Sequence, residues 1–148
     1  MSQDTLYGKI RFSPKAESIA FLHKGKKTIF HVSTLTYFGI NRNGKTQVYK
    51  ILVNHWKEYI FVEVLTEGKL DLYYYDTKYN ERYTSSDPYR YYIGTEEINP
   101  IRMSPRSYRY ILERMFNDRS GLLAQLADYE DVPRIVKEYN TLLGMNLE

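Results

Sequence analysis

The chain has 148 residues, the length of about one ordinary domain, and a formal net charge of +3. It has no cysteine, which excludes disulfides, thiolate metal sites and cysteine nucleophiles. Residues 1–103 carry 15 basic and 11 acidic side chains and residues 104–148 carry 6 and 7, so the mixed charge argues against a dedicated nucleic-acid binder. No apolar run approaches the roughly 18 residues that a membrane-spanning helix needs.

Residues 6–102 are expected to form antiparallel strands, because apolar and polar side chains alternate along them. The first strand, residues 6–12, places Leu6, Ile10 and Phe12 on one face. Four hairpins are predicted after it, with glycine supplying the positive φ at three of their turns. They pair residues 18–23 with 28–32, 37–40 with 46–53, 58–65 with 69–75, and 89–93 with 97–102.

The hydrophobic period changes from two to 3.6 after residue 103, which predicts helices. Ser104-Pro105 suits a helix start, residues 120–127 suit a short second helix, and Asp131 begins a third that Gly144 would end. The expected fold is α+β: an antiparallel sheet or partly open barrel of hairpins (residues 1–103), followed by a C-terminal bundle of two or three helices (residues 104–148) packed on it as one structural unit.

Residues 39–46 match the nucleotide-binding pattern G-x-x-x-x-G-K-[ST]. That loop works only where a strand enters it and a helix leaves it, because the helix N-terminus helps to hold the phosphates. Here the residues that follow Thr46 alternate and are partly β-branched, which predicts a strand. Asn43-Gly44 suits a type I′ turn. The segment is therefore interpreted as a hairpin, and no nucleotide is expected to bind.

No other segment predicts catalysis. His23 and His31 could lie on paired strands, but no third ligand has the spacing of a metal site, and no serine has the context of an activated nucleophile. The sequence accordingly predicts no catalytic residue, no metal and no cofactor.

The tyrosine-rich segment of residues 73–92 is the candidate functional surface. Tyrosine beside arginine is typical of recognition surfaces, since the ring offers rigid area and the hydroxyl a polar contact. In a strand, Tyr73 and Tyr75 share one face and Tyr74 takes the other. The alternative is that these rings cover the sheet and hold the helices against it. The predicted binding surface comprises Tyr73, Tyr74, Tyr75, Tyr79, Arg82, Tyr83, Arg90 and Tyr91.

The order of these segments resembles a family of uncharacterised envelope proteins of Gram-negative bacteria. The resemblance rests on residues 7–12, 30–40 and 61–75. It also rests on two sequence patterns, Tyr92-Ile93-x-x-x-Glu97-Ile98 and Ile135-Val136-x-x-Tyr139-Asn140. It implies export and a periplasmic or surface location, and some relatives carry this unit ahead of an outer-membrane barrel. Members often have a cysteine between the first two helices, where this chain has residues 116–121. The family supplies no catalytic residue.

Three functions follow as alternatives. The first is a non-catalytic binding or adaptor module of the cell envelope, with a protein or glycan as partner, if an export signal has been removed ahead of residue 3. The second is a cytoplasmic protein that binds single-stranded nucleic acid, suggested by mild basicity and aromatic strands. The third is an enzyme of unrecognised type. The oligomeric state stays open.

Overall fold

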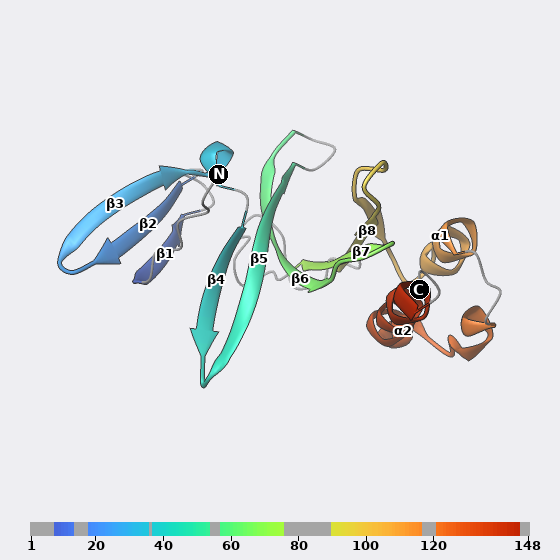
Figure 1. Cartoon of the computed structure of the whole chain (residues 1–148). Coiled ribbons are helices and arrows are strands. Elements are labelled where there is room, and N and C mark those ends of the chain that lie inside the picture. The colour runs from blue at the N-terminus through green and yellow to red at the C-terminus, as the bar shows by residue number, and fades with distance from the viewer. Residues whose placement is uncertain are drawn as a thin grey trace. The chain divides into compact units, whose positions relative to one another are not determined.

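The computed structural model describes residues 8–13, 18–35, 37–53, 57–75, 90–116 and 121–145 (Figure 1). The strands are β1 Lys9–Ser13, β2 Ser18–His23, β3 Lys26–His31, β4 Tyr37–Arg42, β5 Lys45–Val53, β6 Tyr59–Thr66, β7 Asp71–Tyr75, β8 Tyr91–Gly94 and β9 Ile101–Met103. The helices are α1 Tyr108–Met115 and α2 Val132–Met145, with 3-10 turns η2 Val32–Thr34, η3 Leu122–Gln125 and η4 Tyr129–Asp131.

Within the described residues the strands form two open antiparallel sheets, one of three strands in the order β1-β2-β3 and one of six in the order β4 to β9. The predicted α+β class is therefore confirmed, with open sheets in place of a barrel. The chain divides into two compact units inside β6, between Val62 and Glu63, and not at the change from strands to helices near residue 103. The helices share a unit with β7, β8 and β9.

The first unit contains β1 to β5 and the beginning of β6. Its core gathers Ile19, Val32 and Phe61, with Phe38 packed against them. Phe38 stacks on Tyr49 at 5.3 Å between ring centroids and meets Phe61 edge-on at 5.9 Å. Aromatic pairs of this geometry stabilise a fold beyond their buried area, so they hold the β4–β5 hairpin to β6.

Residues 39–46 form the predicted hairpin. Arg42 of β4 pairs with Lys45 of β5, and Asn43 and Gly44 between them have φ of 52° and 79°. Positive φ at both central residues defines a type I′ turn, whose twist matches that of the flanking strands. The chain leaves the turn as the nine-residue strand β5, so no helix N-terminus is present to hold a phosphate.

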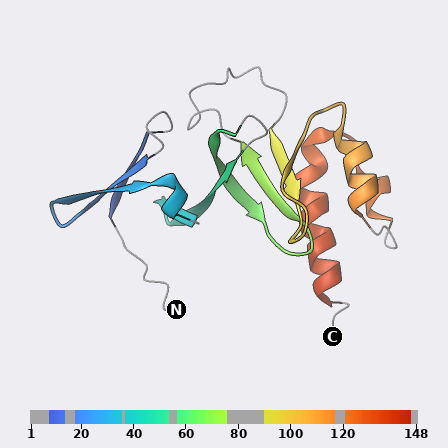
Figure 2. The same ribbon diagram turned by 90° about the horizontal axis from the view of Figure 1, so that it is seen from above.

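The second unit packs both helices on one face of β7 and β8, as Figures 1 and 2 both show. Leu72 pairs with Ile93 across β7 and β8, and both side chains are fully buried. The apolar stripes predicted for the helices supply the other side of this core: Tyr108, Leu112, Phe116, Val132, Ile135, Val136 and Tyr139 are buried, Ile111, Met115 and Leu143 are partly buried, and Leu142 is exposed.

Several expected boundaries were wrong. The second helix is only the 3-10 turn η3, which is bounded by Gly121 with a left-handed φ of 69° before it and by Leu126 in an extended conformation after it. Gly144 lies inside the last turn of α2, since helical bonding continues to Met145. Glu97 lies in a loop, because the Thr95 hydroxyl accepts hydrogen bonds from the N–H groups of Glu97 and Ile98.

The start of α1 lies later than the sequence indicated. Ser104 does accept hydrogen bonds through its hydroxyl, from the N–H groups of Arg106 and Ser107 at 3.2 and 3.1 Å. Those bonds close a turn, and α1 begins after it at Tyr108. The predicted capping chemistry of Ser104 is thus present one turn ahead of the helix.

Candidate binding surfaces

Most of the described tyrosines of the candidate surface are not on the surface. Tyr73, Tyr75 and Tyr91 are buried, and Tyr74 is partly buried. The reason is that β7 and β8 are interior strands of the six-stranded sheet, and side chains on both faces of them are covered. For these rings the structure corrects the prediction of an exposed recognition surface in favour of the packing alternative.

Arg90 is exposed, as the candidate surface requires. Its backbone N–H donates to the Tyr129 hydroxyl at 3.3 Å, so the backbone at this position belongs to the fold even though the side chain faces solvent. Tyr79, Arg82 and Tyr83 lie outside the described residues. The candidate surface is therefore reduced, among the residues that the structure describes, to Arg90 and part of Tyr74.

Tyr129 shows what the aromatic side chains of this unit do. Its ring meets Tyr91 at 4.9 Å and Tyr108 at 5.4 Å, and Tyr74 in turn lies 5.8 Å from Tyr91. The Tyr129 hydroxyl donates to the Met103 carbonyl oxygen at 2.8 Å and accepts from the N–H of Tyr91 at 3.3 Å. The rings thus join the start of β8, the end of β9 and the helices.

Burial raises the pKa of Tyr129 to about 12, although the hydrogen bonds from the Tyr91 and Arg90 N–H groups favour the ionised form. The pKa of Tyr91 is also raised, first by burial and then by the nearby Glu130 carboxylate. Neither phenol is therefore set up as a general base near neutral pH, which is consistent with a structural role.

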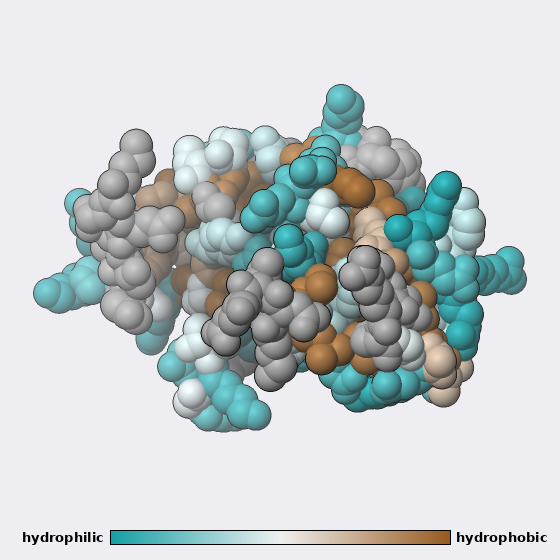
Figure 3. Space-filling view, turned by 45° about the vertical axis from the view of Figure 1, so that its right-hand side comes forward, coloured by the Kyte–Doolittle hydropathy of each residue, from teal (hydrophilic) through white to brown (hydrophobic). Residues whose placement is uncertain are grey.

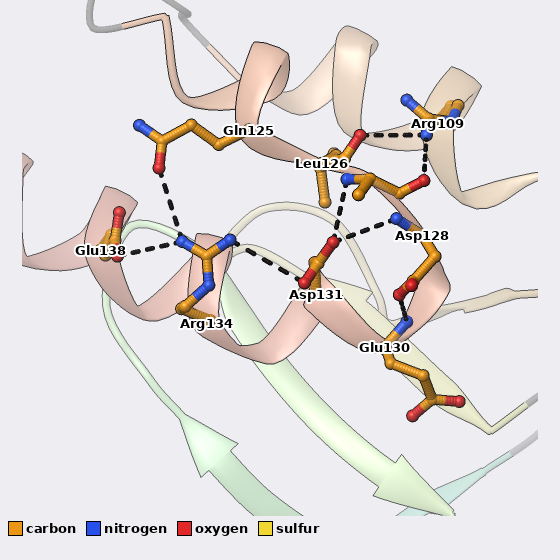
Figure 4. A network of polar contacts seen from close by, with 9 residues as sticks. Arg109, Gln125, Leu126, Asp128, Glu130, Asp131, Arg134 and Glu138 are labelled. Atoms are coloured by element: carbon orange, nitrogen blue, oxygen red, sulfur yellow. Dashed lines mark hydrogen bonds and ion pairs between the residues drawn. The ribbon is translucent and has the colours of Figure 1, made fainter.

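A polar network joins α1, η3, η4 and α2 at one edge of the unit (Figure 4). Arg109 donates to the carbonyl oxygens of Leu126 and Ala127 at 3.0 and 2.9 Å. Asp131 accepts from the N–H groups of Ala127 and Asp128, and these bonds lower the pKa of its carboxyl. Arg134 bridges Asp131 to Glu138. Arg109, Asp131 and Arg134 all bond to groups on other elements or turns of this unit, so the network connects the helices.

No group of three or more potential metal ligands occurs among the residues that the structure describes. His23 pairs with Lys26 and His31 with Ser18, so the two histidines lie at opposite ends of the β2–β3 hairpin. The His31 ring is held by the Ser33 hydroxyl, 2.7 Å from its Nδ1. His55 lies outside the described residues.

The first unit has a strong excess of basic over acidic side chains, which the charge count over residues 1–103 does not reveal. Residues 5–57 contain ten lysines and arginines and a single acidic residue, Glu17. Residues 1–62 carry ten basic and three acidic side chains, whereas residues 63–148 carry 11 and 15. Counts over shorter windows reveal this asymmetry, because 16 of the 18 acidic residues lie at or beyond Glu58.

The outer face of the β1-β2-β3 sheet presents part of this charge. Lys9, Leu22 and Lys27 form one row across the three strands. Two residues away along each strand, Arg11, Ala20 and Ile29 form a second row on the same face. The opposite face carries Ile19 and Phe21, which are buried. The first face is therefore the outer one, with basic side chains on the two edge strands.

Large apolar side chains are also exposed elsewhere in the described residues, among them Val48, Val53, Ile98 and Tyr110. On the face drawn in Figure 3, hydrophobic atoms lie among hydrophilic ones and form no single uninterrupted surface. Scattered apolar exposure of this kind is ordinary in folded proteins. A surface with function must therefore be argued from which side chains lie together.

No family model, no curated protein and no solved structure matches this chain. Within the described residues, no helix has both the length and the apolar character that a membrane crossing requires.

Proposed function

We propose that the chain is a non-catalytic binding module that holds an anionic partner on the basic side chains of its first unit. The observation that carries this proposal is that the described residues between 8 and 53 include eight lysines and arginines and no aspartate or glutamate. Such a concentration of one charge sign raises the local potential and attracts partners of the opposite sign. The resemblance to envelope proteins supports a periplasmic or surface location for that partner.

The aromatic side chains of the second unit support a scaffold role in this proposal. Their hydroxyls and rings hold β8, β9 and the helices together, as described for Tyr129. The described residues also bring together no set of groups that would act as nucleophile, base and orienting partner.

Single-stranded nucleic acid is the second candidate partner, since the same charge would attract its phosphates. Proteins that bind single strands without sequence preference stack successive bases on exposed rings. Among the aromatic side chains described in the first unit, Tyr37 alone is exposed, and the Lys50 ammonium lies 5.3 Å from its ring centroid. This pair is the stacking site that the described part of the first unit offers to a base.

The test measures the affinity of the full chain for inorganic polyphosphate at low salt. Lys26→Gln/Lys45→Gln changes two exposed lysines of the first unit, and Lys69→Gln/Lys137→Gln changes two exposed lysines of the second, so both variants lose the same net charge. We expect the first variant to bind several-fold more weakly and the second to stay within about twofold of the parent. Absence of binding, or equal losses in both variants, contradicts the proposal.

A further inference from the structure

The outer face of the β1-β2-β3 sheet combines two properties that one class of anionic partner needs together. Its basic side chains Lys9, Arg11 and Lys27 are all exposed and lie on the edge strands β1 and β3. Its apolar side chains Leu22 and Ile29 are 42% and 63% exposed. Leu22 lies directly between Lys9 and Lys27 in the sheet, and Ile29 lies two residues beyond Lys27 on β3, diagonal to Leu22, so these two side chains form a short apolar strip among the cations.

We propose that this outer face docks on the surface of a membrane that contains anionic phospholipid, an inference that rests on the proposed function and names its partner. Surfaces that adsorb to a bilayer insert apolar side chains at the boundary of headgroups and acyl chains while basic side chains contact the headgroups. The alternating register supplies both sets on a single face, because residues two apart along a strand point the same way.

Charge complementarity and the exposed apolar side chains together favour this partner over the others. The three strands contain basic residues and no aspartate or glutamate, so the negative headgroups meet no repulsion from the docking face. A single-stranded nucleic acid stacks its bases on aromatic rings, and Leu22 and Ile29 have none, so both side chains would stay exposed in such a complex. A purely polar glycan would leave them exposed as well. The membrane surface is the partner that uses both the cations and the apolar strip.

The edge strand β3 presents Ile29 to solvent, and every residue of β3 except Phe30 is exposed. Lysines on an edge strand discourage pairing with another chain. Lys26 and Lys27 thus protect β3 from edge-to-edge association and leave its side chains available on the face.

The experiment measures binding of the full chain to phosphatidylcholine vesicles with and without phosphatidylglycerol. Lys9→Gln/Lys27→Gln is compared with Lys69→Gln/Lys137→Gln, which removes the same charge from exposed lysines of the second unit. We expect the outer-face pair to weaken binding to the anionic vesicles by about tenfold to thirtyfold and the control pair by less than about threefold. Neutral vesicles should bind no variant appreciably.

The apolar strip is tested separately by Leu22→Thr/Ile29→Thr. Its matched control is Val48→Thr/Val53→Thr on β5, whose parent side chains are 38% and 59% exposed. Threonine keeps a high strand propensity in both, and circular dichroism with thermal melting verifies folding. We expect roughly fivefold to tenfold weaker vesicle binding for the first pair and no change for the second.

The outcomes separate the two proposals. Polyphosphate binding without binding to phosphatidylglycerol vesicles, or vesicle binding that Leu22→Thr/Ile29→Thr leaves unchanged, overturns the docking face and leaves the anionic module standing. Tighter binding to a single-stranded oligonucleotide than to the vesicles also overturns it. If the parent chain does not bind polyphosphate, both the anionic module and the docking face are contradicted.

Discussion

At the scale of single residues, the Tyr129 hydroxyl is the most connected polar atom of the second-unit core described above. Tyr129→Phe removes the donor to the Met103 carbonyl oxygen and the acceptor for the N–H groups of Arg90 and Tyr91. Groups left buried without a partner cost about 1 to 3 kcal/mol, so urea unfolding should show a loss of that size. Tyr110→Phe, at an exposed ring, is the control and should change stability by less than about 0.5 kcal/mol.

The same residue predicts a loss of stability in alkali. The folded pKa of Tyr129 is about 12, above its ordinary value of 10.0, so the folded state keeps the phenol proton where the unfolded state has lost it. This contribution is complete below about pH 10 and is lost as the pH rises through about 12. Urea unfolding at about pH 9 and about pH 11 should show a smaller difference for Tyr129→Phe than for the parent. Equal differences would assign the alkaline loss to other groups.

Residue patterns allowed some of these features to be predicted and others not. The Asn43-Gly44 turn was predictable because positive φ depends on the residues that adopt it. The burial of Tyr73, Tyr75 and Tyr91 was not, because alternation assigns a side chain to a face without saying whether that face is covered. Tyr91 is covered by the core that includes the helices, whereas Tyr73 and Tyr75 lie on the opposite face of the sheet.

At the scale of elements, Asn140 fixes α2 to the loop between β6 and β7. Its side-chain amide accepts from the Leu70 N–H at 3.0 Å and donates to the Leu70 carbonyl oxygen at 2.8 Å, as a neighbouring strand would. Gly68 lies so close that an added Cβ would stand 2.8 Å from the Asn140 side chain. Residues 68–70 and 140, about 70 positions apart in the sequence, therefore meet in space.

This contact predicts the effect of Asn140→Ala. The change leaves both backbone groups of Leu70 without the amide, so unfolding free energy should fall by about 1 to 3 kcal/mol, measured by urea denaturation. Thr141→Ala, one residue along α2 at an exposed position, removes only a hydroxyl that donates to the Lys137 carbonyl oxygen. Its stability should stay within about 0.5 kcal/mol of the parent. Similar losses in both variants would contradict this assignment to the Leu70 contact, because alanine favours the helix more than asparagine or threonine does.

Element types were the most predictable part of the fold. Strand alternation and the helical stripes identified the β hairpins, α1 and α2, since each pattern follows from the geometry of one element. The short elements failed for local reasons: Gly121 with its left-handed φ precedes η3, and Thr95 closes the loop ahead of β9. Those outcomes depend on single hydrogen bonds and dihedral angles that hydrophobic periodicity does not contain.

At the scale of the whole molecule, the separation of charge is the feature that bears on function. The net charge of +3 conceals a basic stretch up to residue 57 and an acidic excess beyond it. It was present in the sequence, but a division at the strand-to-helix boundary hid it. The division between compact units falls inside β6, close to where the acidic excess begins, because the helices fold together with β7 to β9.

The central claim, that the first unit holds an anionic partner, is tested most directly by the salt dependence of polyphosphate binding. The slope of log affinity against log salt reports how many ionic contacts form. We predict that Lys26→Gln/Lys45→Gln reduces the magnitude of this negative slope by roughly 1 to 2, whereas Lys69→Gln/Lys137→Gln leaves the slope unchanged. A slope that falls equally in both variants, or one near zero in the parent, would contradict the account.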